Sequence, residues 1–403
     1  VMAHSVQSVV QAASYKVAAR EGEEMATKGP FCVVGAMSGT SLDGVDAAQI
    51  VTDGMRVAER GPTAYRPYTA TERRTLRTAL GKWPDDDISE AAEIIETAHA
   101  EVLSRFPDAE VFGFHGQTLA HDPAGRGTHQ AGDGAILAEV LGRAVVWDFR
   151  SNDVAMGGQG APLAPFYHFA LAQEFGATDP LAILNLGGVG NLTWIDPTAP
   201  TPETPGALLA FDTGPANAPI DDLIRARTGA ARDEDGALAS AGTADQDIVA
   251  EFLKHAYFPK IPPKSLDRND FSALPNMIAD LTVEDAAATL TAIVAACVAT
   301  GLDHCPTPPT RLLVTGGGRH NPAIMTALAS RLACPVASVE DVGLNGDMLE
   351  AEAFAFLAVR VLRGLPTSAP GTTGVAAAGQ RRQRDESGQV FLLFQWLFHF
   401  FFY

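Results

Sequence analysis

A unit made of an apolar strand, a glycine-rich turn and a second apolar strand occurs twice in this sequence, near residues 31–51 and 181–195. Short apolar runs separated by small residues and glycine are typical of β-hairpins. The recurrence predicts two similar domains that each begin with a hairpin and face each other. Because later apolar segments alternate between strand and helix patterns, the predicted fold class is α/β with mixed sheets.

The first turn, residues 38–46, holds more polar groups than a bare hairpin needs. Glycines let the backbone approach a ligand, and successive N–H groups in a tight turn form a concave site for anions. We interpret this turn as a cradle for nucleotide phosphates, with a carboxylate beside it for a metal ion. An ordinary turn with solvated aspartates is the alternative. The predicted nucleotide-binding residues are Gly39, Thr40, Ser41, Leu42, Asp43, Gly44, Val45 and Asp46.

Two further glycine-rich turns, at residues 187–190 and 316–318, also follow apolar strands. Three such turns favour a nucleotide held between two lobes, with the hairpins at the phosphates and the third turn at the purine and ribose. Three unrelated turns are the alternative, because glycine is common in turns of every kind. The sequence has no Walker A motif and no HRD or DFG set, which excludes those nucleotide folds. The residues added to the predicted nucleotide site are Gly187, Gly188, Asn191, Gly316, Gly317 and Gly318.

Charge and cysteine content narrow the class of protein. The chain has 403 residues and a net charge of −19, which argues against binding to nucleic acid or to an anionic membrane surface. Its four cysteines form no CxxC pair, which fits a reducing, cytoplasmic compartment and predicts neither a zinc site nor a disulfide framework. The apolar end, residues 390–403, is shorter than the about 20 residues that a membrane-spanning helix needs, so no membrane span is predicted.

We predict the following domain boundaries. They are an N-terminal extension at 1–29, a first domain at 30–160 with 347–366, a second domain at 161–346 and an atypical tail at 367–403.

Seven motifs occur in a fixed order: GTSLDGVDA, HGQT, DFRxxD with GGQGAPL, NLGGVGN, FDTGPAN, GGGRHNP and GDMLEA. In this order, over about residues 31–366, they resemble the anhydro-N-acetylmuramic acid kinases. That family shares its fold with actin, hexokinase and the heat-shock chaperones of the same group. The resemblance implies two ribonuclease-H-like (actin-like ATPase) domains with ATP in the cleft between them, and it suggests a homodimer.

The resemblance also implies a double reaction in peptidoglycan recycling. Water opens the ring of 1,6-anhydro-N-acetylmuramic acid while O6 receives the γ-phosphoryl group of ATP, which gives N-acetylmuramic acid 6-phosphate and ADP. Phosphoryl transfer needs positioning, a metal ion and charge stabilisation. Asp43 is the predicted ligand of Mg²⁺, held through water, and Asp46 is the alternative.

Ring opening resembles the reaction of an inverting glycosidase, in which one carboxylate activates water. One base suffices here, because the phosphoryl group captures the leaving oxygen. Asp212 is the predicted base, since it follows the predicted strand 207–211 and matches the catalytic aspartate of the family's DTGPxN motif. Capping of a helix near Pro219 is its alternative role. The residues predicted to contact the sugar are Gln117, Thr118, Asp153, Asn217 and Glu350.

Two departures from the family pattern bear on sugar preference. Ala216 replaces a usual glycine, and Ser151 and Asn152 replace a basic pair. Arg150 could face a phosphate or pair with a neighbouring aspartate, and His115 is more typical of a structural residue.

Two other functions remain open. One is a sugar kinase that phosphorylates a free hydroxyl. The other is a non-enzymatic ATP-dependent module of the chaperone kind, which the lack of a peptide-binding domain disfavours.

Overall fold

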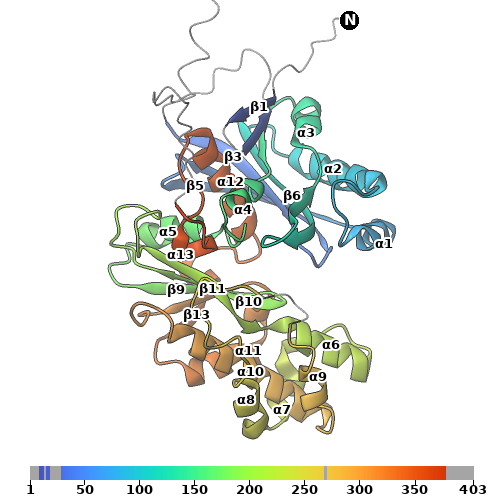
Figure 1. Ribbon diagram of the computed structural model, residues 1–403, viewed down its shortest axis with the longest axis vertical. Helices are drawn as coiled ribbons and strands as arrows, with labels where there is room; N and C mark the ends of the chain where they lie inside the picture. Colours follow the sequence, from blue (N-terminus) through green and yellow to red (C-terminus); the bar gives the residue numbers. More distant parts are fainter. Residues whose placement is uncertain (1–8, 13–14, 19–28, 267–269, 378–403) are drawn as a thin grey trace, which may run out of the picture. The chain divides into compact units, whose positions relative to one another are not determined.

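The computed structural model describes residues 9–12, 15–18, 29–266 and 270–377, and they form two compact units (Figure 1). Unit 1 comprises Val1–Ala161, Ala351–Ala369 and Val375–Tyr403, and unit 2 comprises Pro162–Glu350 and Pro370–Gly374. The apolar end at 390–403 lies outside the described residues.

Unit 1 is built on a mixed sheet whose first three strands form an antiparallel meander. These are β3 (Phe31–Ser38), β4 (Gly44–Thr52) and β5 (Val57–Pro67). On the other side of β3, β6 (Val111–Asp122) and β8 (Ala144–Trp147) continue the sheet in parallel. The order along the sheet is therefore β5-β4-β3-β6-β8.

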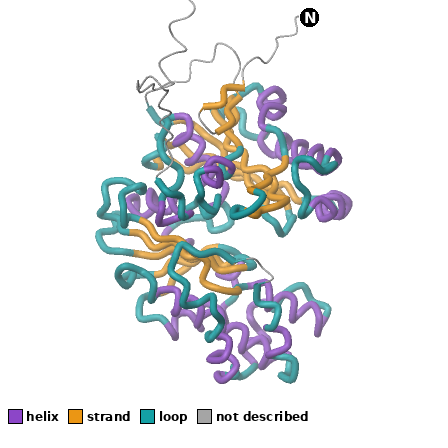
Figure 2. Tube along the Cα trace, viewed as in Figure 1, coloured by secondary structure: helices purple, strands orange, loops and turns teal. Residues whose placement is uncertain are grey.

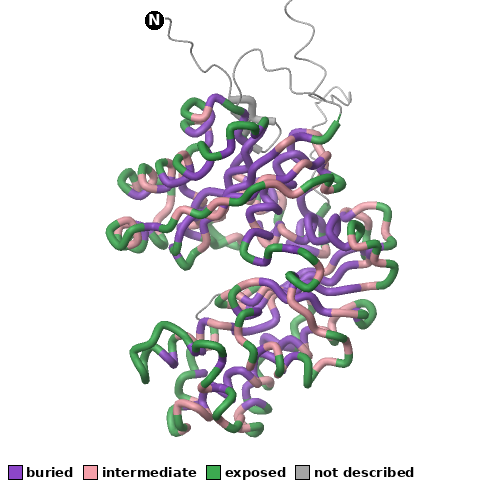
Figure 3. The backbone as a smooth tube through the Cα atoms, turned by 180° about the vertical axis from the view of Figure 1, so that it is seen from behind, coloured by how far each residue is buried: buried purple, intermediate pink, exposed green. Residues whose placement is uncertain are grey.

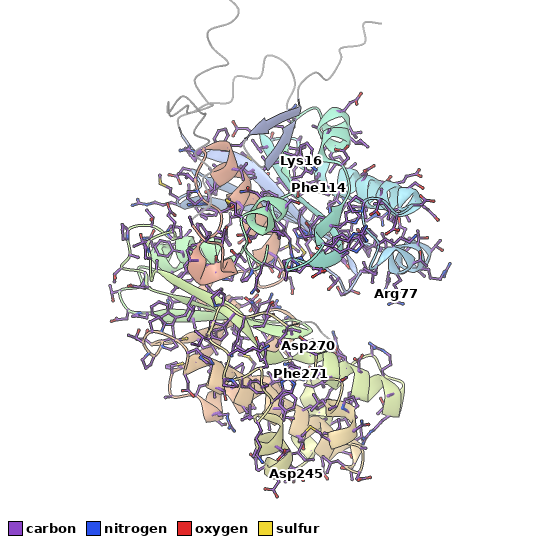
Figure 4. All side chains as sticks on the ribbon, in the orientation of Figure 1. Lys16, Arg77, Phe114, Asp245, Asp270 and Phe271 are labelled. Carbon is purple, nitrogen blue, oxygen red and sulfur yellow. The ribbon has the colours of Figure 1, made fainter. Side chains whose placement is uncertain are left out.

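Two further pairings extend this sheet. Strands β1 (Val9–Ala12) and β2 (Tyr15–Ala18), within the predicted N-terminal extension, form a hairpin, and β2 pairs with β8. Lys16, labelled in Figure 4, forms an ion pair of 3.2 Å with Asp148. Strand β7 (Gly127–Ala131) pairs with β6.

Helices cover both faces of the sheet of unit 1. Helices α1 (Ala70–Ala79), α2 (Ser89–Leu103) and α3 (Gly134–Leu141) contribute to one buried core with the strands. Helix α12 (Leu349–Leu362) packs directly on β3 and β6, because a Cβ at Gly35 would lie 1.9 Å from Ala351 O, too close for any side chain. The short helix α4 (Ser151–Ala155) follows β8.

Unit 2 repeats the same strand topology. An antiparallel meander of β9 (Leu181–Leu186), β10 (Val189–Ile195) and β11 (Leu208–Pro215) is continued in parallel by β12 (Leu312–Thr315) and β13 (Val336–Ser338). The order β11-β10-β9-β12-β13 matches β5-β4-β3-β6-β8 of unit 1 strand for strand. The predicted pair of similar α/β domains of the ribonuclease-H-like class is thus confirmed.

The helices of unit 2 surround its sheet, as the secondary-structure colours of Figure 2 show. The longest is α10 (Val283–Leu302), whose side chains form much of the buried core. Among the described residues it is the one helix long and apolar enough to cross a membrane, but 72% of that apolar window is buried inside the protein, as in a core helix. Figure 3 shows buried backbone running through the sheets of both units. The other helices are α5 (Pro165–Glu174), α6 (Asn217–Thr228), α7 (Ala237–Ala241), α8 (Gln246–Phe252), α9 (Leu274–Met277), α11 (Pro322–Arg331), α13 (Pro370–Thr373) and the 3₁₀ turns η1 (Glu234–Gly236), η2 (Gly317–His320) and η3 (Val339–Val342).

Two strands run further than the sequence predicts. Gln117 and Thr118 lie inside β6, past the apolar run that ends at Phe114, and β7 supplies their hydrogen-bonding partners. Similarly, Asp212 lies within β11 and does not follow its end, because β10 pairs with β11 as far as Pro215. Polar residues interrupt the apolar pattern of both strands, although the backbone ladder continues through them.

Candidate active site

The turn of the second hairpin lies in unit 2, where the start of α6 packs against it. Asn217 donates from its backbone N–H to Gly187 O over 2.9 Å and from Nδ2 to Leu186 O over 2.9 Å. The N–H of Ala216 donates to Gly188 O over 3.1 Å. The amide of Asn217 therefore holds the turn in place, which is a structural role beside its predicted contact with the sugar.

The two glycines of this turn have space around them. A Cβ added at Gly187 would meet nothing closer than 3.7 Å, and one at Gly188 would lie 3.5 Å from Ala218 Cβ, an ordinary contact. Neither packing within the protein nor a left-handed backbone explains why glycine stands there. A bare backbone that can approach an anion closely gives such an explanation and fits a phosphate-binding turn.

The triple glycine after β12 has a different environment. A Cβ at Gly316, where φ is +76°, would lie 2.2 Å from Asn185 Oδ1, and one at Gly318 would lie 2.6 Å from Leu186 Cβ. These two glycines are therefore required for the loop to pack against β9. A contact of this loop with a purine or ribose stays a prediction, for which Gly317 has more space, with Asn217 Nδ2 at 3.4 Å.

Arg319, which follows the triple glycine, connects this loop to the segment before α12. Its side chain is only 2% exposed and bonds to Glu340 from Nε (2.8 Å) and to Asp347 from Nη2 (2.9 Å). Nη1 also donates to Gly316 O over 2.9 Å. Sequence reasoning missed this residue, although the arginine directly after three glycines in GGGRHNP was a visible signal.

Glu350 also lies beside β9. Its Oε1 accepts a hydrogen bond of 3.0 Å from Nδ2 of Asn185. Asn185 Oδ1 in turn lies against Gly316. The structure thus brings Glu350, the triple glycine and the second hairpin together at one end of β9 within unit 2.

Asp212 lies at the same end of this sheet, opposite Asn191 in the register of β10 and β11. Its Oδ1 accepts from Asn191 Nδ2 and its Oδ2 accepts from the backbone N–H of Leu266, both over 2.8 Å. Burial raises the pKa of Asp212 from 3.8 to about 6, and the two hydrogen bonds oppose this shift by favouring the charged form.

This environment suits a general base. A carboxyl with a pKa of about 6 is mostly ionised at pH 7 and still basic enough to take a proton. Each oxygen of Asp212 accepts one described hydrogen bond and keeps a lone pair for water. The two donors also fix the orientation of the carboxylate.

The backbone of Asp212 is held as well, by a loop that sequence reasoning treated only as a break between helices. Tyr257 donates from its hydroxyl to Asp212 O over 2.5 Å. The N–H of Asp212 donates to Lys264 O over 2.9 Å. Long-range partners of this kind leave no local pattern in the sequence, so Tyr257, Lys264 and Leu266 were missed.

In unit 1, the first turn is joined to β6 through Gln117. Ser38 Oγ donates to Gln117 Oε1 over 2.6 Å, and Gln117 Nε2 donates to Gly39 O over 3.2 Å. Because Gln117 is fully buried, the structure shows it supporting the turn, and its contact with the sugar stays a prediction. A Cβ at Gly39 would meet nothing closer than 3.6 Å, the same open environment as in the second hairpin.

The predicted metal ligand, Asp43, is an exposed residue of this turn. Burial raises the pKa of the Tyr65 hydroxyl, and the negative charges of Asp43 and Asp46 raise it further. Both carboxylates therefore lie near Tyr65. No group of three or more metal-ligating side chains occurs among the described residues. Binding of Mg²⁺ at Asp43 or Asp46 stays a prediction.

The remaining predicted residues of unit 1 have protein partners. Asp153 is buried and accepts from the N–H of Gly160 over 2.6 Å, so it orders the glycine cluster that follows α4. Thr118 Oγ1 accepts from Gln130 over 3.3 Å.

Arg150, for which two roles were open, donates from Nε to Nε2 of the buried His115 over 3.1 Å. Burial holds the pKa of His115 well below its usual range, so the ring stays neutral and accepts.

Comparisons with known proteins show the family to which the chain belongs. A family model described as anhydro-N-acetylmuramic acid kinase matches residues 31–380, which is past the predicted end of the resemblance at 366. The anhydro-N-acetylmuramic acid kinase of Cereibacter sphaeroides is 62% identical over 362 residues, which cover 89% of this chain and 98% of that protein. Those of Ruegeria sp. (58% over 356 residues, 88% and 95%) and Roseobacter denitrificans (60% over 353 residues, 88% and 94%) are similar to it as well. The chain belongs to the anhydro-N-acetylmuramic acid kinase family.

Proposed function

We propose that this protein is an ATP-dependent kinase that opens 1,6-anhydro-N-acetylmuramic acid with water and phosphorylates O6, in peptidoglycan recycling. The products are N-acetylmuramic acid 6-phosphate and ADP. The observation that carries the proposal is the environment of Asp212, a carboxylate held by two donors at the end of β9–β11 where the open glycine turn also lies. Membership of the family supports the choice of sugar.

In this reaction Asp212 takes a proton from water while the water oxygen bonds to the anomeric carbon. The bond from that carbon to O6 breaks, and its electron pair stays on O6. O6 then bonds to the γ-phosphorus of ATP, and the bond to the β-phosphate oxygen breaks. All atoms are accounted for without a second acid, because phosphorus takes the place that a proton has in an ordinary glycosidase.

The phosphates of the nucleotide would be bound by backbone N–H groups of the open glycines Gly187 and Gly188 in unit 2. Gly39 in unit 1 has the same open environment and stays a predicted phosphate contact. Mg²⁺, when bound through Asp43 or Asp46, supplies positive charge that neutralises the phosphates. We also propose that the protein works as a homodimer in the cytoplasm; the four free cysteines fit a reducing compartment.

The test uses the full chain with Mg·ATP and 1,6-anhydro-N-acetylmuramic acid in ¹⁸O-labelled water. Mass spectrometry at early times, before anomeric exchange, is expected to show one ¹⁸O at C1 of the phosphorylated product. Asp212→Asn is expected to lose turnover, whereas the matched control Asp222→Asn, an exposed carboxylate on α6, is expected to keep it.

Two results would overturn the proposal. Phosphorylation of a free-hydroxyl sugar without ¹⁸O incorporation would identify an ordinary sugar kinase in which Asp212 deprotonates the hydroxyl. Absence of any sugar-dependent ADP release would instead favour a non-enzymatic ATP-dependent module.

A further inference from the structure

We propose that Lys264 is a positioning residue for Asp212: its buried ammonium group anchors the loop from Tyr257 to Leu266, and that loop fixes the carboxylate. This inference rests on the proposed function only in that Asp212 is taken to act as the base. The geometry of the loop stands without that assumption.

The loop contacts Asp212 at three points. The Tyr257 hydroxyl donates to Asp212 O, and Lys264 O accepts from the N–H of Asp212. Two residues further on, the N–H of Leu266 donates to Asp212 Oδ2. Main-chain and side-chain positions of Asp212 are therefore both set by a segment that is distant in sequence and has neither helix nor strand between Pro259 and Leu266.

Lys264 holds this irregular segment through hydrogen bonds from its side chain to the backbone of the same loop. The residue is only 7% exposed, and its Nζ donates to Phe258 O over 2.8 Å and to Tyr257 O over 3.4 Å. These bonds close the loop on itself. Nζ also lies 4.7 Å from the centroid of the Tyr257 ring, so the same ammonium positions the tyrosine whose hydroxyl reaches Asp212.

A buried lysine without a carboxylate partner is unfavourable unless its donors are used. Burial lowers the pKa of Lys264 to about 8, with Lys260 adding to that effect and Cys297 opposing it. The polar groups within hydrogen-bond distance of Nζ are the two loop carbonyls and His304 Nε2 at 3.2 Å, and His304 Nε2 also lies 2.9 Å from Phe258 O. Each of these contacts fixes the loop, which is the expected pattern for a residue that positions a backbone.

An aromatic cluster holds the outer side of the loop. Phe271, labelled in Figure 4, stacks on Phe258 with centroids 6.1 Å apart and contacts Tyr257 edge-on at 6.2 Å. These rings limit where the two carbonyls that accept from Lys264 can move. Loss of the ammonium would therefore free the Lys264–Leu266 end of the loop more than the Tyr257–Phe258 end.

The first experiment measures the pKa of Asp212 without any substrate. The full-length protein is labelled with ¹³C at aspartate carboxyl carbons, and Asp212→Asn assigns the resonance. Lys264→Met keeps the apolar stem but removes the donors, and we expect the pKa of Asp212 to rise by about one pH unit as the Leu266 hydrogen bond loosens. Lys254→Met, an exposed lysine paired with Glu251, is the matched control and should leave the value unchanged.

A neutral substitution separates positioning from charge. Tyr257→Phe keeps Lys264 and removes only the hydroxyl that bonds to Asp212 O, so a rise in the pKa of Asp212 in this variant cannot come from a lost positive charge. It also decides the question if Lys264→Met does not fold. An unchanged value in Tyr257→Phe, or in a folded Lys264→Met, would overturn the proposal.

Kinetics then link the loop to turnover. If the proposed function holds, Lys264→Met should lower kcat about tenfold or more, move the acidic limb of the kcat/KM profile upward and leave ATP affinity unchanged. A shifted pKa in a protein with no activity on the anhydro sugar would reject the function and keep the positioning role. Full activity with an unshifted pKa would reject the positioning role and keep the function.

Discussion

Asn191 in β10 lies directly across from Asp212 in β11, and its Nδ2 donates to Asp212 Oδ1 over 2.8 Å. The pairing joins a residue of the second glycine hairpin to the proposed base through the sheet itself. Because strand register fixes it, the distance does not depend on a flexible loop. It also joins a residue of the predicted nucleotide site to the proposed base within one unit.

The first prediction concerns this hydrogen bond. Asn191→Ala removes a donor that favours the ionised carboxylate, so the pKa of Asp212 should rise above about 6. The acidic limb of the kcat/KM profile should move to higher pH in parallel. Asn276→Ala, at an exposed position on α9, is the matched control, and an equal profile in both variants would contradict the assigned role of Asn191.

The second prediction is the pH dependence of the wild-type protein. Below pH 6 the carboxyl of Asp212 becomes protonated and cannot accept a proton from water, so kcat/KM should fall about tenfold per pH unit. The measurement is a rate profile from pH 4.5 to about pH 8. A flat profile down to pH 5 would show that another group is the base.

The third prediction is the effect of Asp212 on stability. Its folded-state pKa lies above the ordinary value, so the folded protein binds more protons between pH 4 and pH 6 and loses stability as the pH rises through that range. The free energy of unfolding of the wild type relative to Asp212→Asn should fall by about 1–3 kcal/mol from pH 4 to pH 7. Denaturant titrations of both proteins at the two pH values provide the measurement.

The fourth prediction contrasts two glycines. At Gly188 a Cβ meets only Ala218 at 3.5 Å, so Gly188→Ala should change the free energy of unfolding by less than about 0.5 kcal/mol while weakening ATP binding. At Gly318 a Cβ would lie 2.6 Å from Leu186, so Gly318→Ala should cost about 1–3 kcal/mol in stability. Calorimetric ATP titration and urea unfolding of both variants distinguish these outcomes. Normal ATP affinity in Gly188→Ala would remove this glycine from the nucleotide site.

The fifth prediction concerns Arg319. Arg319→Met removes the bonds that join Gly316 to Glu340 and Asp347, and the free energy of unfolding should fall by about 1–3 kcal/mol. Both carboxylates are partly exposed and can be solvated, which keeps the loss moderate. Arg331→Met, at an exposed position on α11, is the control in urea unfolding, and equal stability of the two variants would show that Arg319 does not brace the loop.

Much of the fold could be predicted from apolar runs. The two strand–turn–strand units expected near residues 31–51 and 181–195 are the hairpins β3–β4 and β9–β10, because continuous burial produces an uninterrupted apolar pattern. Strand β7 was missed, since its sequence, Gly127–Ala131, is polar and small, and pairing with β6 decides its structure. Tertiary pairing overrides local propensity at such positions.

In the candidate site, too, some residues could be predicted from the sequence and others depend on tertiary contacts. Asp212 could be proposed as the base from the sequence, because it follows an apolar run and matches the family's DTGPxN motif. The partners that orient it were not visible: Lys264 reads as one more charged loop residue, although it is buried. Gln117 and Asp153 were assigned to the sugar, whereas the structure shows the hydrogen bonds they make within the protein.

The donor to Asp212 Oδ2 is a peptide group and not a side chain. A mutational scan that truncates side chains one at a time would therefore leave this hydrogen bond in place and would not reveal one of the two described donors to this carboxylate. Replacing the amide of residue 266 by an ester deletes that single N–H and leaves every side chain in place. Any residue except proline at this position supplies the same backbone donor, so the Leu266 side chain is constrained by its packing against the core and not by the hydrogen bond to Asp212.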